Sequence, residues 1–163
     1  MNPPKIVNIP PRKLAGMRIR TSMANDQTRS LWQRFRPRIK DIPDRLQSGM
    51  YSVQILDPNL QQEDFTPHTE FEKWAAVEVS SFDRLPDDME GLVLSGGAYA
   101  VYTYKGPASA YFQTYHYVVN TWLPGTPYEL DHREQFEIMG DNYHPMDPEA
   151  EEEVWIPVRE KTS

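Results

Sequence analysis

Three glutamates lie inside segments whose sequence predicts β-strands, where carboxylates are uncommon. They are Glu78 in AAVEVSS, Glu137 in QFEIMG and Glu153 in EEEVWIPV. Glu137 lies between two apolar residues and should point away from both, whereas Glu153 and Trp155 share one face of their strand. A carboxylate in an apolar cavity is a natural counter-ion for a lipophilic cation, or a general base that activates water. A solvent-facing position on a half-exposed sheet is the alternative for each.

Aromatic residues are concentrated in the second half of the chain, where nine of the nineteen fall between residues 99 and 128. The spacing of apolar residues over 108–123 predicts one face of an amphipathic helix. Tyr and Trp need hydrogen-bond partners when buried, so these rings suit a half-filled cavity as well as a solid core. The candidate ligand-binding residues are therefore these glutamates and the rings near them: Glu78, Glu137, Glu153, Trp74, Tyr102, Phe112, Tyr115, Trp122 and Trp155.

The charge is unevenly divided along the chain. Residues 1–81 hold 12 basic and 9 acidic residues, whereas residues 82–163 hold 5 and 15. An acidic and aromatic half suits a ligand that is apolar and cationic. The net charge of −7 argues against direct nucleic-acid binding, which requires a basic surface. Arg34, Arg36 and Arg38 are spread around the first predicted helix by their spacing, which indicates a solvated face that pairs with the acidic half or a protein partner.

Several kinds of site are excluded by residue types and spacing. The chain has no Cys, so it can form no disulfide and has no thiol nucleophile. It carries neither a nucleotide-binding glycine motif nor a GxSxG elbow, and its four histidines show no paired ligand spacing. We therefore expect no metal and no cofactor. No apolar run approaches the length of a membrane helix, and the N-terminus lacks the apolar core of a signal peptide, so we expect a cytoplasmic protein without a membrane partner.

The two halves of the chain carry the same order of predicted elements. The first half predicts a strand at 12–20, a helix at 27–40 and strands at 50–56 and 73–79. The second half predicts a strand at 98–105, a helix at 108–123 and strands at 135–139 and 152–158.

One helix cannot cover the apolar sheet face of a β-α-β-β unit unless a second unit joins it. We therefore predict an α+β fold of duplicated β-α-β-β units with pseudo-twofold symmetry, whose antiparallel sheet curves around a central ligand pocket. A single domain is expected over residues 1–163, with repeats of about 1–85 and 92–163. Trp74 and Trp155 take equivalent places on the last strands of the two repeats.

Four short motifs of the second half resemble the GyrI-like, or AraC-type, effector-binding domain of bacterial transcription regulators. They are Gly106-Pro107, Trp122-Leu123-Pro124, Phe136-Glu137 and Ile156-Pro157-Val158. The resemblance implies a pocket for hydrophobic cations or multiple drugs, with Glu137 as its buried glutamate and Glu153 and Trp155 as supporting residues. In many members the module follows a DNA-binding domain, and this chain resembles a stand-alone version.

We therefore expect a module that binds small lipophilic, cationic ligands and has no DNA-binding domain. The first alternative is a hydrolase of reactive cyclopropane-type electrophiles, in which Glu137 or Glu153 would be catalytic. The second is a protein that interacts with DNA gyrase or with a regulator.

Overall fold

The computed structural model describes residues 3–57, 59–60, 64–141, 143–144, 147 and 149–162. The strands are β1 (Lys5–Ile9), β2 (Arg12–Thr21), β3 (Arg45–Ile55), β4 (Phe71–Val79), β5 (Glu90–Leu94), β6 (Gly97–Lys105), β7 (Tyr128–Leu130), β8 (Gln135–Met139) and β9 (Glu151–Glu160). Helix α1 (Thr28–Phe35) continues into the 3-10 turn η1 (Arg36–Asp41). A second helical stretch joins η3 (Ala108–Ala110), α2 (Tyr111–Tyr117), the π-helical η4 (Val118–Trp122) and η5 (Leu123–Gly125).

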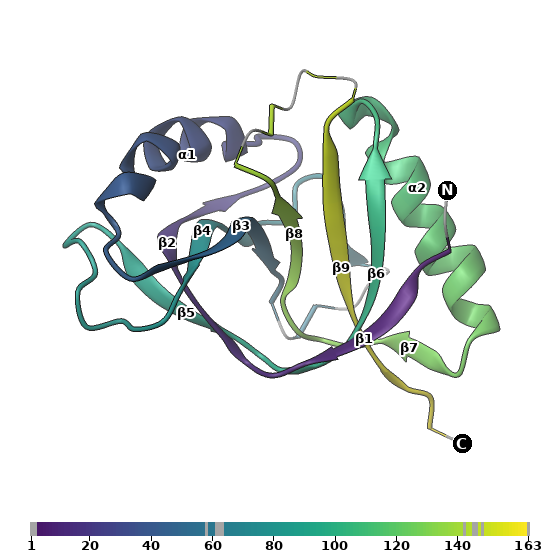
Figure 1. The fold of residues 1–163 in the computed structure, drawn as a ribbon. Helices are drawn as coiled ribbons and strands as arrows, with labels where there is room; N and C mark the ends of the chain where they lie inside the picture. Colours follow the sequence, from purple (N-terminus) through teal and green to yellow (C-terminus); the bar gives the residue numbers. More distant parts are fainter. Residues whose placement is uncertain are drawn as a thin grey trace.

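The strands form one antiparallel sheet in the order β1-β6-β9-β8-β3-β4-β2-β5, and β7 pairs with β9 (Figure 1). The two halves meet where β3 pairs with β8. On either side of this pair, each half contributes a strand, a helix and two further strands in the same spatial order. The predicted α+β fold of two β-α-β-β units with pseudo-twofold symmetry is therefore confirmed.

The outermost strands are exchanged between the halves. β1 precedes β2 in the chain but pairs with β6 of the second half. β5 precedes β6 but pairs with β2 of the first half. Pairing of β2 with β4 brings the backbones close at Gly16, where an added Cβ would lie 2.0 Å from the carbonyl oxygen of Ala75.

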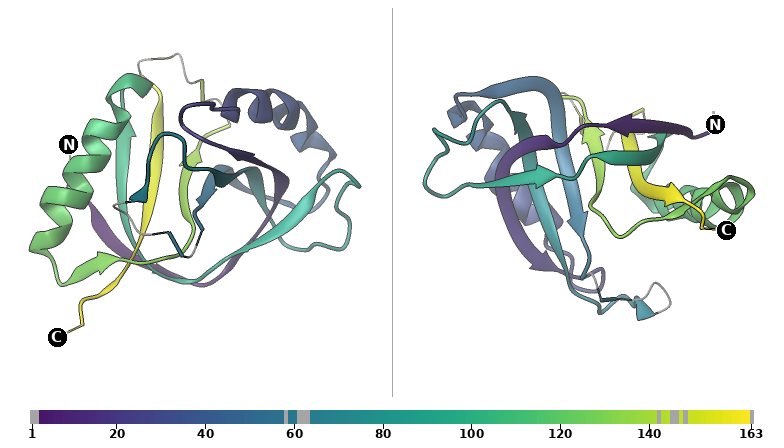
Figure 2. Two further views of the ribbon diagram at one scale, coloured as in Figure 1. Left: turned by 180° about the vertical axis from the view of Figure 1, so that it is seen from behind. Right: turned by 90° about the horizontal axis from the view of Figure 1, so that it is seen from below.

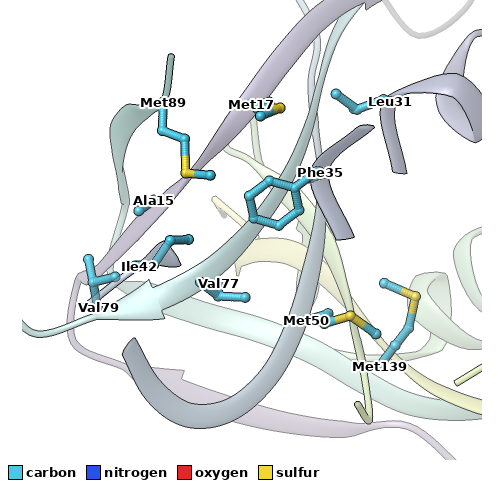
Figure 3. Packing of buried hydrophobic residues seen from close by; sticks show 11 residues of the cluster. Ala15, Met17, Leu31, Phe35, Ile42, Met50, Val77, Val79, Met89 and Met139 are labelled. Atoms are coloured by element: carbon cyan, nitrogen blue, oxygen red, sulfur yellow. The ribbon is translucent and has the colours of Figure 1, made fainter. Parts of the chain in front are cut away.

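Both helices lie on the same face of the sheet. α1 packs Leu31 and Phe35 into a core with the methionines and small residues of β2, β3 and β4 (Figure 3). The second helical stretch packs Val118 and Val119 against β6 and β9. The two cores lie on the same face, because directly paired residues on neighbouring strands point to the same side of a sheet. One such row crosses six strands and joins the two cores: Met17, Ala75, Ser52, Glu137, Val154 and Tyr102.

The sheet curls toward the opposite face (Figure 2). The guanidinium of Arg12 on β2 lies 5.2 Å from the ring centre of Trp155 on β9, although three strands lie between β2 and β9. A flat sheet would place these strands roughly 19 Å apart. The inner face of the curl is filled by a third core, whose fully buried members include Leu14, Tyr51, Val53, Tyr99 and Phe136.

The sequence-based prediction missed three strands. β1 lies between two proline pairs, Pro3-Pro4 and Pro10-Pro11, which mask its strand pattern. β5 and β7 span only five and three residues, which is too short for a clear alternation. No helix among the described residues has the length and apolar character that crossing a membrane requires.

Candidate functional site

Glu137 lies on β8 at the centre of the helix-bearing face, between the two helix cores. Its neighbours in the ladder are Ser52 of β3 and Val154 of β9. Alternation along the strand sends Phe136 and Ile138 to the inner face and the Glu137 side chain to the helix-bearing face. Glu137 is only 7% exposed. A carboxylate is therefore buried where the two halves of the sheet meet, at the pairing of β3 with β8.

A chain of hydrogen bonds links Glu137 to a buried lysine. Lys73 of β4 donates from Nζ to Oε1 of Gln54 at 2.7 Å, and Nε2 of Gln54 donates to Oε2 of Glu137 at 2.9 Å. Lys73 is 7% exposed. Burial raises the pKa of Glu137, and the charge of Lys73 and the Gln54 hydrogen bond oppose that rise. Burial lowers the pKa of Lys73, and nearby carboxylates, led by Glu137, oppose that fall.

Tyrosines surround this carboxylate on the side of α2. Tyr102 extends from β6, and Tyr111 and Tyr115 extend from α2, where their rings stack with centroids 6.5 Å apart. The hydroxyls of Tyr102 and Tyr111 are buried and have no hydrogen-bond partner among the described residues. Burial raises the pKa of all three phenols, to about 12 for Tyr115, and the charge of Glu137 adds to the effect. These phenols stay neutral at physiological pH.

A second carboxylate, Glu152 of β9, faces the same cluster. It is two residues before Val154, which pairs with Glu137, and it therefore points to the same face. Its pKa is raised to about 7, first by burial and then by the charge of Glu137, while Lys73 and a hydrogen bond with Tyr143 hold it lower. Burial also raises the pKa of Tyr143 to about 12. We call the following residues the central polar cluster: Gln54, Lys73, Tyr102, Tyr111, Tyr115, Glu137, Tyr143 and Glu152.

The central polar cluster contains three of the candidate residues chosen from the sequence, namely Glu137, Tyr102 and Tyr115. Two others lie elsewhere on the helical stretch. Phe112 is 48% exposed and makes an edge contact with Tyr111, at 5.4 Å between ring centroids. Trp122 packs against the core that α2 forms with β6 and β9.

The other four candidates lie on the inner face and are not brought together with Glu137. Trp155 and Glu153 pair with Phe136 and Ile138, the two neighbours of Glu137 that point away from it. Trp74 belongs to the inner core, and Glu78 accepts a hydrogen bond from the hydroxyl of Ser48 at 2.7 Å. The family resemblance implied that Glu153 and Trp155 would support Glu137 from the neighbouring strand. The observed register separates them.

Glu152, rather than Glu153, is the acidic residue of this strand that reaches the cluster. The sequence did contain a usable signal, because Val154, Ile156 and Val158 alternate in phase with Glu152 and form the surface that α2 covers. Lys73, Gln54 and Tyr143 come from distant parts of the chain. Only the pairing of β3 with β4 and β8 places the first two beside Glu137.

A surface hollow of about 610 Å³ lies at the edge formed by β1, β6 and β9. Its lining includes Lys5, Val101, Glu153 and Trp155. Val101 and Trp155 belong to the inner core, whereas Tyr102, Tyr104 and Thr114 line the hollow from the helix-bearing side, so it is open to both faces of the sheet edge. Tyr102 lines this hollow and also belongs to the central polar cluster, which holds the buried carboxylate of Glu137.

The arginines that follow the first helix bind groups of the chain itself. Arg38 forms ion pairs with Asp41 and Asp88. Arg36 donates to the carbonyl oxygens of Asp141 and Tyr143 at 2.8 and 3.0 Å. The Arg38–Asp88 ion pair is an instance of the predicted pairing with the acidic second half, whereas Asp41 belongs to the first half and Arg36 binds backbone carbonyl groups. Within the part of the chain that the structure describes, His, Asp and Glu form no group that could hold a metal ion.

Comparisons with known proteins found a family model and a relative that match this chain. The family model of the GyrI-like small molecule binding domain matches residues 2–159. The transcriptional regulator BrlR of Pseudomonas aeruginosa is 26% identical over 155 residues, which are 94% of this chain and 54% of BrlR. The chain therefore spans about half the length of this relative.

Solved structures share the fold. One is SAV2435 bound to tetraphenylphosphonium, with a TM-score of 0.70 and 14% identity, covering 96% of this chain and 93% of that chain. Another is a hydrolase from Listeria innocua, with a TM-score of 0.62 and 10% identity, covering 96% and 92%.

Proposed function

This chain belongs to the family of GyrI-like small-molecule-binding domains, and from that membership we propose that it binds lipophilic cations at the central polar cluster. Glu137 supplies the counter-charge, and the tyrosine rings supply the apolar walls. Tyr102 and Tyr115 are direct ligand contacts in this proposal. Glu78, Glu153, Trp74 and Trp155 are not, because they lie on the other face of the sheet.

The burial of the Glu137 carboxylate is the observation that carries the proposal. A buried carboxylate loses its hydration, and the hydrogen bond that Glu137 accepts from Gln54 replaces only part of that hydration. A cation that brings no hydration shell of its own can restore the lost electrostatic stabilisation. Aromatic faces around it would add about 0.5–2 kcal/mol for each cation–π contact.

Two further observations support a ligand at this place. The hydroxyls of Tyr102 and Tyr111 have no hydrogen-bond partner among the described residues, and each would cost about 1–3 kcal/mol if nothing ever hydrogen-bonded to it. The related fold of SAV2435 is bound to tetraphenylphosphonium, a lipophilic cation. The match to a transcriptional regulator supports a role in which ligand binding is the signal that a regulator reads.

The wider role follows from the same proposal. The chain acts as one cytoplasmic domain that accepts several drugs of this class, without binding nucleic acid directly. A protein partner such as a regulator or gyrase stays a prediction. Arg36 and Arg38, which suggested a surface for such a partner, bind groups of the chain itself and give it no further support.

Calorimetric titration with tetraphenylphosphonium tests the proposal. Glu137→Gln keeps the shape and the hydrogen bonding of the side chain but removes its charge, and we expect it to weaken binding at least about tenfold. Glu153→Gln, an exposed neighbour on the other face, is the matched control and should bind like the wild type. Equal affinities for the wild type and Glu137→Gln would refute the role of Glu137.

Hydrolysis of a reactive electrophile is the second candidate function, and one observation favours it. Glu152, with a pKa raised to about 7, is suited to take a proton from water near neutral pH, and Glu137 lies beside it. The shared fold of a hydrolase from Listeria innocua also supports this reading. Assay of a cyclopropane-containing electrophile should show turnover that Glu152→Gln abolishes. A wild-type rate no greater than that of buffer would reject it.

A further inference from the structure

Lys73 is a buried cation built into the central polar cluster. Its ammonium donates a hydrogen bond to the amide oxygen of Gln54, and the amide nitrogen of Gln54 donates a hydrogen bond to Glu137. The direction of the amide is fixed at both ends, because only its oxygen can accept from Lys73 and only its nitrogen can donate to Glu137. Each charge also opposes the effect of burial on the other group, because Glu137 favours the ammonium of Lys73 and Lys73 favours the carboxylate of Glu137.

The charged and titratable groups around the cluster come from every element that packs there. They are Glu137 on β8, Glu152 on β9, Lys73 on β4, Tyr102 on β6, Tyr111 and Tyr115 on α2, Tyr143 before β9, and Asp26 before α1. The phenols are neutral, and Asp26 is exposed, so solvent screens it. When both glutamates are ionised, the buried groups carry a formal charge of −1.

We propose that Lys73 is a specificity-determining residue that sets the charge of the accepted ligand at +1. This inference rests on the proposed function, since it concerns the ligand of the same cluster. A monocation balances the buried charge, whereas a dication leaves an excess positive charge within a site that already contains an ammonium. Removal of Lys73 changes the buried charge to −2 and shifts the preference toward dications.

Three probes of similar size and shape separate charge from ring stacking. They are 4-phenylpyridine, which is neutral at pH 8, the monocation N-methyl-4-phenylpyridinium, and the dication N,N′-dimethyl-4,4′-bipyridinium. Titrations at pH 8 keep Glu152 largely ionised, because its pKa is about 7. The wild type should bind the monocation most tightly of the three.

The variants are Lys73→Met and Lys73→Gln, which remove the charge, and Lys73→Arg, which keeps it. We expect the ratio of monocation to dication affinity to fall at least about tenfold in the first two variants and to change less than about twofold in Lys73→Arg. The affinity for 4-phenylpyridine should stay within about threefold of wild type throughout. Circular dichroism identifies the variants that fold, and Lys73→Gln decides the matter if Lys73→Met does not.

An unchanged ratio in a folded Lys73→Met or Lys73→Gln variant, with monocation binding retained, overturns the role of Lys73 and leaves the proposed function intact. Absence of binding by the wild type for both cations overturns the proposed function and this inference together. A ratio that falls equally in Lys73→Arg also overturns the inference, because shape rather than charge would then be responsible.

Discussion

Replacing Glu152 by Gln should stabilise the protein above neutral pH and leave its stability unchanged at low pH. The pKa of Glu152 is raised from 4.5 to about 7 in the folded protein, first by burial. Between these two pH values the folded state holds a proton that the unfolded state has released. The free energy of unfolding therefore decreases as pH rises through this window, and the full penalty is present above pH 7.

The size of the penalty follows from the shift. A displacement of one pKa unit corresponds to about 1.4 kcal/mol, so the shift of Glu152 corresponds to an upper figure of about 3 kcal/mol. A Gln side chain has nearly the same shape, can still accept the hydrogen bond from Tyr143, and never ionises. At pH 8.5 the variant should gain up to about 3 kcal/mol, which for a chain of this length raises Tm by roughly 6–12 °C. At pH 4.5 and below the difference should vanish.

Urea unfolding at pH 4.5, 6, 7 and 8.5 provides the measurement, with thermal unfolding as a second probe. Glu153→Gln is the control, since Glu153 is exposed on the other face of the same strand. A stabilisation by Glu152→Gln that is constant over this range, or that grows as pH falls, would refute the reasoning. The same profile in the Glu153 variant would show that general surface charge is responsible.

Four more substitutions have defined outcomes. Tyr102→Phe removes a buried hydroxyl that has no hydrogen-bond partner among the described residues, so urea unfolding should show no loss of stability and a gain of up to about 1 kcal/mol; a clear loss would mean that the hydroxyl is hydrogen-bonded. Gly16→Ala places a methyl group 2.0 Å from the carbonyl oxygen of Ala75, so the variant should lose about 3 kcal/mol or fail to fold, and normal expression with an unchanged Tm would contradict this close approach. Phe35→Ala should cost about 3–5 kcal/mol in chemical denaturation because Phe35 is fully buried, whereas Phe112→Ala, at a residue 48% exposed, should cost less than about 1 kcal/mol; similar losses would contradict the assigned packing.

Local patterns in the sequence predict much of this fold because each strand and helix buries one face. The apolar spacing of residues 108–123 predicts the second helical stretch, and it is observed as consecutive 3-10, α and π segments. The alternation around Glu137 correctly predicts that its side chain points away from Phe136 and Ile138. Trp74 and Trp155, expected to be equivalent, lie on one row of the inner face with Val53 and Phe136 between them.

The composition of the candidate site was harder to predict because it depends on register between distant strands. Alternation shows that Glu152 and Glu153 point in opposite directions, but it does not say which direction faces Glu137. That choice is made by the pairing of Glu137 with Val154. Lys73 lies 64 residues before Glu137 in the sequence and reaches it only through β3. The central polar cluster is thus a product of tertiary structure.

The exchanged outer strands interlock the two repeats. A cut in the loop after β4 would leave a first fragment that retains β1 but lacks β6, the partner of β1, and a second fragment that retains β5 but lacks β2. Each fragment would expose an unpaired strand edge that only the other can fill, so neither should persist alone, and mixing should reconstitute the whole domain. The exchanged strands thus tie each half to the other at both ends of the sheet, on either side of the β3–β8 pair at which the halves meet.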